Sequence, residues 1–231
     1  LGLFGPNSRN FLTNLVGDYF SNIDFPFASG KYLNFANVKI WFQRLSFVGE
    51  LGWELYIPIK KSKMIFKLIQ NLGKKHNLCY AGMHTLDMLR LEKKFLHWGH
   101  DITSENNPIE AGLSFAVNLN KKENFIGRQS IEKIVKNPLK KKLELFSLKN
   151  AKKPGMPLLM HDEPIFLENK IIGYSTSSNY SFNYEKNIFL AYVKAELDLT
   201  KKLSIEVEGN NYLINHEIEC LHDPKGLKLR N

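Results

Sequence analysis

The chain has 231 residues, of which 43% are hydrophobic and 24% are charged. These shares are typical of globular proteins and exclude a disordered or fibrous protein. Lys and Arg outnumber Asp and Glu by 32 to 23, which gives a formal net charge of +9. The two cysteines, Cys79 and Cys220, form no CxxC pair, so a disulfide framework and a zinc ribbon are excluded. No apolar run reaches the roughly 18–20 residues of a membrane span, and we expect a soluble, cytoplasmic protein.

The positive charge is spread along the whole chain. Short lysine pairs recur at 60–61, 121–122 and 201–202, at the apparent ends of secondary-structure elements. Nucleic-acid binders gain affinity by clustering Lys and Arg, so this scatter favours a solvated surface. We therefore expect neither a nucleic acid nor a membrane as partner, whereas a polyanionic small ligand would benefit from the positive field.

Periodic apolar positions predict mixed helices and strands in the first part of the chain. Residues 1–6 predict a strand end that runs through a turn into a helix, and this abrupt start indicates the later part of a longer protein. Alternating apolar residues predict strands over 38–43 and 53–58, joined as a hairpin. Helical spacing and turn signals predict the remaining elements: helices over 62–73, 83–93 and 129–135, and an apolar strand over 113–119.

A proline followed by a lysine run, at 136–140, marks the expected domain boundary. Beyond it no helical period appears, and short alternating strands are separated by turn residues. These strands are expected at 142–148, 170–175, 188–193, 203–207 and 212–218. The pattern predicts an α+β protein with a first domain over 1–137 and a small antiparallel barrel or sandwich over 138–231.

Glu50 is the first candidate functional residue, because it lies in the expected hairpin connection between two glycines and near Phe47 and Trp53. A carboxylate held there can accept hydrogen bonds from two N–H donors of an aminopyrimidine-like edge. The alternative interpretation is a solvated glutamate in a turn, since turns attract polar residues.

Two further clusters favour structural interpretations. Asp87 and Arg90 stand three residues apart on an expected helix, where an ion pair explains them. The run 97–101, HWGHD, contains two imidazoles, an indole and a carboxylate. Zinc sites usually need three or four convergent ligands, so an aromatic pocket wall is favoured over a metal site, and we expect no metal. The chain contains neither a nucleophile-elbow serine nor a glycine-rich phosphate loop.

Several motifs, taken together and in order, resemble the glycine-cleavage T-protein (aminomethyltransferase) superfamily. They are LFGPNSR at 3–9, RLSFVGELGWEL at 44–55, LRLEK at 89–93, HWGHDI at 97–102, PIEAGL at 108–113, FIGR at 125–128 and LHDPKG at 221–226. The forms GELGWEL, RLEK, WGHD and HDPKG are more similar to the folate domains of dimethylglycine and sarcosine dehydrogenases than to the glycine-cleavage enzyme. The resemblance covers nearly the whole chain.

This resemblance implies a three-lobed cloverleaf aminomethyltransferase fold, incomplete at its N-terminus, with a C-terminal antiparallel β-barrel. It also implies tetrahydrofolate-dependent one-carbon transfer, in which a methylene group passes from an amine or iminium donor to folate. The implied partners are folate, a methylamine-type donor and an FAD-dependent oxidase or dehydrogenase domain upstream. Two alternatives stay open: a non-catalytic folate-binding or regulatory module on the same fold, and a folate-dependent demethylase of another methyl donor.

The resemblance also suggests roles for single residues. Glu50 would match the family glutamate that binds the pterin amino edge, with Leu51 and Gly52 beside it as cofactor-binding residues. Phe115 would match an aromatic residue that lines the folate, the alternative being a phenylalanine of a core strand. Leu86 replaces an arginine of the glycine-cleavage enzyme, so the contact of that arginine with the folate tail or substrate is absent.

The family's catalytic aspartate lies upstream of the Gly-Pro motif, in sequence that this chain does not contain. The catalytic residues are therefore unknown, and we expect the chain by itself to be inactive. The whole interpretation depends on Glu50 and Phe115 lining one cavity shaped for a pterin.

Overall fold

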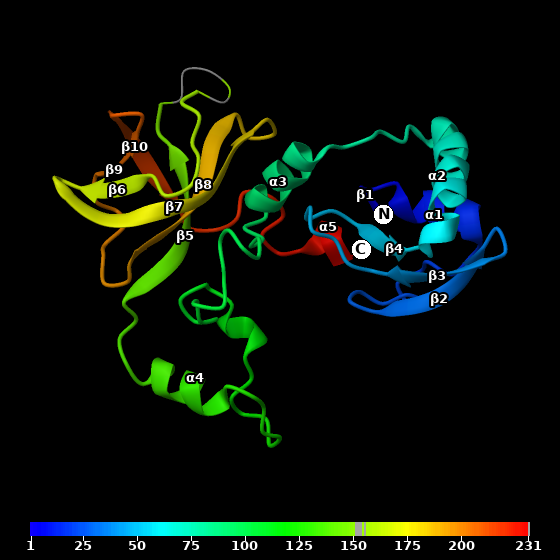
Figure 1. Cartoon of the computed structure of the whole chain (residues 1–231), viewed down its shortest axis with the longest axis horizontal. Helices are drawn as coiled ribbons and strands as arrows, with labels where there is room; N and C mark the ends of the chain where they lie inside the picture. The colour runs from blue at the N-terminus through cyan, green and yellow to red at the C-terminus, as the bar shows by residue number, and fades with distance from the viewer. Residues whose placement is uncertain (151–153, 155, 231) are drawn as a thin grey trace. The chain divides into compact units, whose positions relative to one another are not determined.

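The computed structural model describes residues 1–150, 154 and 156–230, which fall into two compact units (Figure 1). The first unit combines Leu1–Leu89 with the C-terminal segment that begins at His222, and the second is Arg90–Leu221. The described residues include no helix that is long and apolar enough to cross a membrane. The division expected from the sequence, at 137/138, stays a prediction.

The first unit is an antiparallel sheet with two helices on one face (Figure 1). Its elements are β1 (Gly2–Phe4), α1 (Ser8–Val16), β2 (Gly30–Phe35), β3 (Val38–Gln43), β4 (Gly52–Tyr56), α2 (Ile59–Gly73) and the 3₁₀ turn η1 (Lys74–His76). The strands lie in the order β1-β4-β3-β2. The expected hairpin is confirmed, because β3 and β4 pair antiparallel with Gln43 opposite Glu54. The sequence patterns did not predict β2.

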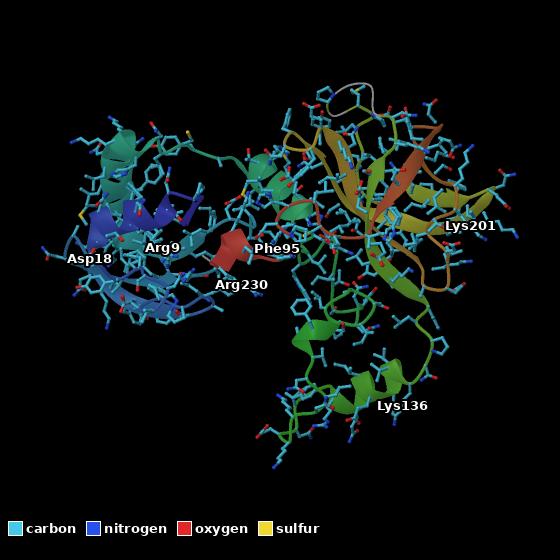
Figure 2. The ribbon with its side chains drawn as sticks, turned by 180° about the vertical axis from the view of Figure 1, so that it is seen from behind. Arg9, Asp18, Phe95, Lys136, Lys201 and Arg230 are labelled. Atoms are coloured by element: carbon cyan, nitrogen blue, oxygen red, sulfur yellow. The ribbon has the colours of Figure 1, made fainter. Side chains whose placement is uncertain are left out.

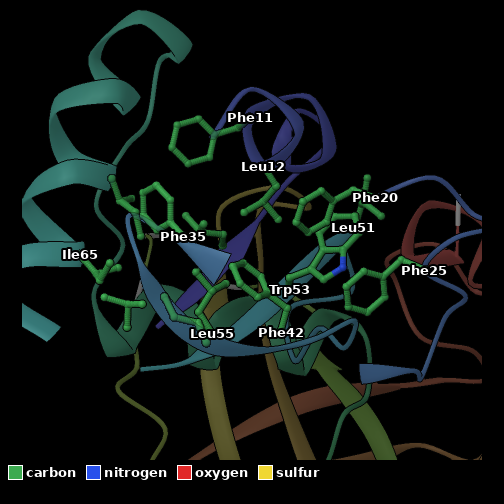
Figure 3. Close-up of a cluster of buried hydrophobic side chains, with 14 residues drawn as sticks. Phe11, Leu12, Phe20, Phe25, Phe35, Phe42, Leu51, Trp53, Leu55 and Ile65 are labelled. Atoms are coloured by element: carbon green, nitrogen blue, oxygen red, sulfur yellow. The ribbon is translucent and has the colours of Figure 1, made fainter. Parts of the chain in front are cut away.

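Buried aromatic rings fill the space between this sheet and its helices (Figure 3). Trp53 is fully buried, and its ring lies 5.4 Å from that of Phe20 and 6.0 Å from that of Phe25. Ile40 and Phe42 point to the same core from β3, while alternate residues of the strand face outward. Alternation therefore sends Trp53 into the core, although it stands close to Glu50 in the sequence.

Helix α2 begins at Ile59 rather than at Ser62, so the expected start is wrong. Pro58 precedes the helix with φ −53°, a value that suits a helix start. The Ser62 hydroxyl donates to the Ile59 carbonyl at 2.8 Å, a bond within the first turn and not an N-terminal cap. The helix expected at 83–93 is confirmed as α3 (Met83–Glu92).

The second unit contains a closed antiparallel barrel of six strands, so the small β-barrel expected from the sequence is confirmed. The strands are β5 (Lys141–Leu148), β6 (Pro164–Leu167), β7 (Lys170–Ser181), β8 (Lys186–Lys194), β9 (Leu203–Val207) and β10 (Asn210–Glu217), in the order β10-β5-β8-β7-β6-β9. Strand β6 was not predicted, because four residues are too few to show alternation. Helix α4 (Arg128–Val135) precedes the barrel, as expected.

The strand expected over 113–119 is wrong. Its centre forms a single 3₁₀ turn, η2 (Ser114–Ala116), in which the Ala116 N–H donates to the Leu113 carbonyl at 3.0 Å. Gly112, with φ +73°, and the turn bond from the Leu113 N–H to the Pro108 carbonyl curl the chain just before it. An apolar run by itself does not specify a strand, since a strand also needs a neighbour with which its backbone can pair.

A buried polar network joins the end of α3 to the barrel. The carboxylate of Asp101, 1% exposed, accepts hydrogen bonds from the buried Arg90 guanidinium, from the His97 backbone N–H at 2.8 Å and from the Thr176 hydroxyl at 2.6 Å. Thr176 belongs to β7. The aspartate of the HWGHD run therefore has a structural role. The rings of His97 and His100 stack at 4.6 Å beside it.

Glu92 makes a second attachment between α3 and the barrel. Its fully buried carboxylate accepts hydrogen bonds from the Ser181 hydroxyl at 2.6 Å and from the Asn183 amide at 2.9 Å. Buried charges are tolerated when hydrogen bonds satisfy them, and these two carboxylates meet that condition. The two charged residues at the end of α3, Arg90 and Glu92, thus serve the packing of this helix end.

We predict that Asp101→Ala destabilises the protein by about 3–5 kcal/mol, because it removes one member of the buried Asp101–Arg90 ion pair. Urea unfolding followed by circular dichroism measures the change in the free energy of unfolding. Asp18→Ala, which removes an exposed carboxylate, is the control and is expected to change it by less than about 0.5 kcal/mol. Equal stability of the Asp101→Ala and wild-type proteins would contradict the structural role of Asp101.

Candidate functional site

Glu50 lies in the loop 44–51 that joins β3 to β4, and its neighbours hold it there. Gly49 has φ +77°, a left-handed conformation that glycine adopts without a steric cost. The Leu51 side chain is buried in the core, and its carbonyl accepts hydrogen bonds from the Gly5 N–H at 2.8 Å and the Ser8 hydroxyl at 3.2 Å. The loop is therefore attached to the structure immediately after Glu50.

Gly52 is required by the packing of β1 on β4. A Cβ atom at this position would lie 2.8 Å from the Leu3 carbonyl oxygen and 2.3 Å from a ring carbon of Phe4, so a larger residue does not fit. The structure thus gives Leu51 and Gly52 packing roles that position Glu50. Their direct contact with a cofactor stays a prediction.

One oxygen of the Glu50 carboxylate is bound by two side chains of the C-terminal segment. Its Oε1 atom lies 2.7 Å from Nε2 of His222 and 3.6 Å from Nζ of Lys228. In the described part of the chain, the other oxygen, Oε2, makes no hydrogen bond or ion pair. The Glu50 side chain is 22% exposed and that of His222 is 14% exposed. The result is a half-buried carboxylate with one oxygen engaged and one available.

The C-terminal segment turns sharply so that His222 and Lys228 meet the same carboxylate. Both oxygens of Asp223 accept backbone hydrogen bonds, from the N–H of Leu227 at 2.9 Å and of Lys228 at 3.1 Å. Gly226, with φ +66°, completes the turn, and the short helix α5 (Leu227–Arg230) follows. Leu229 is buried, so the segment is anchored by apolar packing as well.

Arg44, at the other end of the loop 44–51, also holds this segment. Its fully buried guanidinium donates to the Phe25 carbonyl and to the Arg230 carbonyl, each at 2.7 Å, and lies over the Trp53 ring (Arg230 is labelled in Figure 2). Burial, and then the nearby charge of Arg9, lower the pKa of Arg44 from its usual value. The loop that carries Glu50 therefore contacts the C-terminal segment twice, through Arg44 and through Glu50.

Sequence reasoning missed the roles of Arg44, His222 and Lys228. Arg44 and His222 stand inside motifs that were recognised, RLSFVGELGWEL and LHDPKG, but the spacing of those motifs did not indicate that they meet. A signal was present in the C-terminal run of turn and charged residues, because a proline and a glycine there predict a fixed turn and not a free tail.

Phe115 lies on η2 in the second unit and is 86% exposed. The alternative that it is a core phenylalanine is therefore wrong, and its ring is accessible for stacking. Glu50 belongs to the first unit. The expectation that the two side chains line one cavity stays a prediction. A surface cleft of about 440 Å³ on the barrel is lined by residues such as Lys201, Leu213 and His216 and contains neither of them.

Both parts of the chain match domain families of known proteins. Residues 1–121 match the family described as the GCVT N-terminal domain, and residues 141–219 match the glycine cleavage T-protein C-terminal barrel domain. Human mitochondrial dimethylglycine dehydrogenase is 34% identical over 215 residues, which are 92% of this chain and 24% of that protein. An aminomethyltransferase of Halalkalibacterium halodurans is 32% identical over 197 residues, 85% of this chain and 52% of that protein.

The fold is also shared with a solved structure. The crystal structure of glycine cleavage system aminomethyltransferase T from Bartonella henselae matches with a TM-score of 0.78 at 20% identity, over 94% of this chain and 57% of that one. This likeness confirms the α+β aminomethyltransferase fold with its C-terminal barrel. The chain spans about a quarter of the length of the dehydrogenase and about half that of the aminomethyltransferase it matches. Together, the two domain matches and the fold show that the chain belongs to the glycine-cleavage T-protein (aminomethyltransferase) family.

Proposed function

We propose that this chain is the tetrahydrofolate-binding part of a one-carbon transferase that acts in glycine cleavage or in the demethylation of dimethylglycine or sarcosine. Membership of the aminomethyltransferase family supports the reaction class. The observation that carries the proposal is the half-buried Glu50 carboxylate, whose Oε2 atom faces no partner in the described part of the chain while Oε1 is held by His222 and Lys228.

The partners belong to the same proposal. Folate and a methylamine-type donor are its small molecules, and an FAD-dependent dehydrogenase or oxidase domain upstream would oxidise the donor. The chain is similar to human dimethylglycine dehydrogenase over only about a quarter of that protein's length, which supports a further domain upstream in this proposal. Location in the cytoplasm stays a prediction.

The chemistry of the residues fits a pterin. The amino-pyrimidine edge of a pterin carries neighbouring N–H donors, and a carboxylate is the side chain that accepts such hydrogen bonds most strongly. At 22% exposure, the Glu50 side chain is accessible to a ligand yet partly shielded from water. Phe115 offers an exposed aromatic face, on which a flat ring can stack.

In this proposal the residues of the chain bind and orient, and they form no covalent bond. Tetrahydrofolate supplies the nitrogen atoms that accept the carbon unit. Glu50 fixes the orientation of the ring edge, and Phe115 covers a ring face. Holding the acceptor in one orientation accounts for much of the acceleration in such transfers, because it replaces a random encounter by a prearranged one.

We predict that Glu50→Gln weakens the binding of folinate about 10–100-fold, because a hydrogen bond to a charged acceptor is worth about 1.5–3 kcal/mol. Isothermal titration calorimetry measures the Kd of the wild-type chain and of the variant. The control is Glu196→Gln, which neutralises an exposed carboxylate on the barrel unit and leaves the affinity unchanged. Equal affinities of wild type and Glu50→Gln would refute the proposed role of Glu50.

For Phe115→Ala we expect folinate to bind about 2–10-fold more weakly, since an aromatic stacking pair is worth about 0.5–1.5 kcal/mol. The free energy of unfolding should change by less than about 0.5 kcal/mol, because the ring is exposed. The matched control is Ile126→Ala, which removes another exposed apolar side chain of the same unit. If both variants bind folinate like the wild type, Phe115 does not contact the ligand.

Product analysis separates this function from its alternatives. Transfer of a methylene group, detected as 5,10-methylenetetrahydrofolate by the complete protein, supports the proposal. Transfer of a methyl group identifies a demethylase of another donor. Folate binding without any transfer by the complete protein identifies a non-catalytic module.

A further inference from the structure

The C-terminal segment 222–230 packs through Leu229 and also contacts the Glu50 carboxylate. We infer that His222 and Lys228 are positioning residues for Glu50: they hold its Oε1 atom, so that recognition of the ligand takes place through Oε2. This inference rests on the proposed function, because it specifies how the same carboxylate selects its ligand.

The contacts at Oε1 give the carboxylate a fixed plane. A glutamate carboxylate rotates freely about its last bond when nothing holds it, since this torsion has only broad minima. His222 at 2.7 Å and Lys228 at 3.6 Å both approach the same oxygen, from positions six residues apart in the segment. An ionised carboxylate only accepts hydrogen bonds, so Nε2 of His222 is the donor. A ligand that meets this carboxylate does not have to order it first.

The position of His222 is itself fixed by backbone contacts. Asp223, the next residue, accepts the N–H groups of Leu227 and Lys228, which closes the turn on which both contacting side chains stand. Arg44 binds the carbonyl of Arg230 at 2.7 Å and so holds the far end of the segment. The arrangement of donors around Glu50 is therefore imposed by the turn and does not depend on a flexible tail.

Specificity follows from this arrangement. With Oε1 engaged by two side chains, the ligand meets the carboxylate through Oε2. A ring that carries the 2-amino group offers Oε2 two neighbouring N–H donors, whereas a 2-desamino ring keeps only its ring N–H. A site that binds a donor through a fixed acceptor discriminates strongly against the analogue that lacks it. The positioning residues should therefore affect the preference between these two ligands as well as the affinity.

The test compares the Kd of folinate and of its 2-desamino analogue in four variants: His222→Phe, which removes the donor; His222→Gln, whose amide can replace it; Lys228→Met; and Lys225→Met as control. Lys225 is an exposed lysine of the same turn. We expect His222→Phe to weaken folinate binding about 5–10-fold and to reduce the preference for folinate, His222→Gln to restore most of both, and Lys228→Met to weaken binding about 2–3-fold. Lys225→Met should bind like the wild type.

A double-mutant cycle tests whether His222 acts through Glu50. Adding His222→Phe to Glu50→Gln should cause no further loss of affinity, because the positioned group is already gone. A purely structural role would lower the urea midpoint of His222→Phe but leave the preference between the two ligands unchanged. If His222→Phe does not fold, Lys228→Met, at a side chain that is 58% exposed, gives the same test.

The outcomes distinguish the inference from the proposed function. If the wild-type chain binds no folinate, the proposed function fails. If it binds folinate in a Glu50-dependent way, but His222→Phe and Lys228→Met keep the wild-type affinity and preference, only the positioning role is overturned. Tighter binding by His222→Phe would also overturn it, because the segment would then compete with the ligand for Glu50.

Discussion

The contact between Glu50 and the C-terminal segment is the interaction on which the candidate site depends. It joins residues 172 positions apart. It forms only because the loop 44–51 and the segment that begins at His222 fold into the same unit. Without it, Glu50 would be a glutamate in a turn, which is the alternative that its sequence context also allowed. With it, the carboxylate is oriented, half-buried and presented through one oxygen.

The loop 44–51 combines buried residues that fix its two ends with one residue that keeps an oxygen available. Arg44 at its start is fully buried and saturates two backbone carbonyls, whereas Glu50 at its end keeps an oxygen available. Leu51 and Gly52 continue directly into the core and into β4. Buried groups on both sides thus constrain one half-buried functional group, which is the arrangement that precise recognition requires.

Several residues of the recognised motifs turned out to serve packing. Asp101 of the HWGHD run and Glu92 of the LRLEK run are buried carboxylates that attach α3 to the barrel. Trp53 of the GELGWEL run is the centre of the aromatic core. A motif of this family therefore combines residues that build the fold with a few that remain accessible, and only burial separates the two. Glu50 is one of the partly accessible residues, and Phe115, just beyond the PIEAGL run, is exposed.

The sequence by itself determined the elements whose information is local. Alternation over 38–43 and 53–58 predicted the β3–β4 hairpin, and the short strands beyond 140 predicted the barrel, because side chains of a strand alternate between two faces wherever it lies. The strand predicted for the apolar run 113–119 does not form, since pairing partners decide whether such a run becomes a strand. Only the tertiary structure decided that Glu50 meets His222 and that Phe115 is exposed. Such features depend on how segments that are distant in the sequence pack together, and the local periodicity of apolar residues carries no information about that packing.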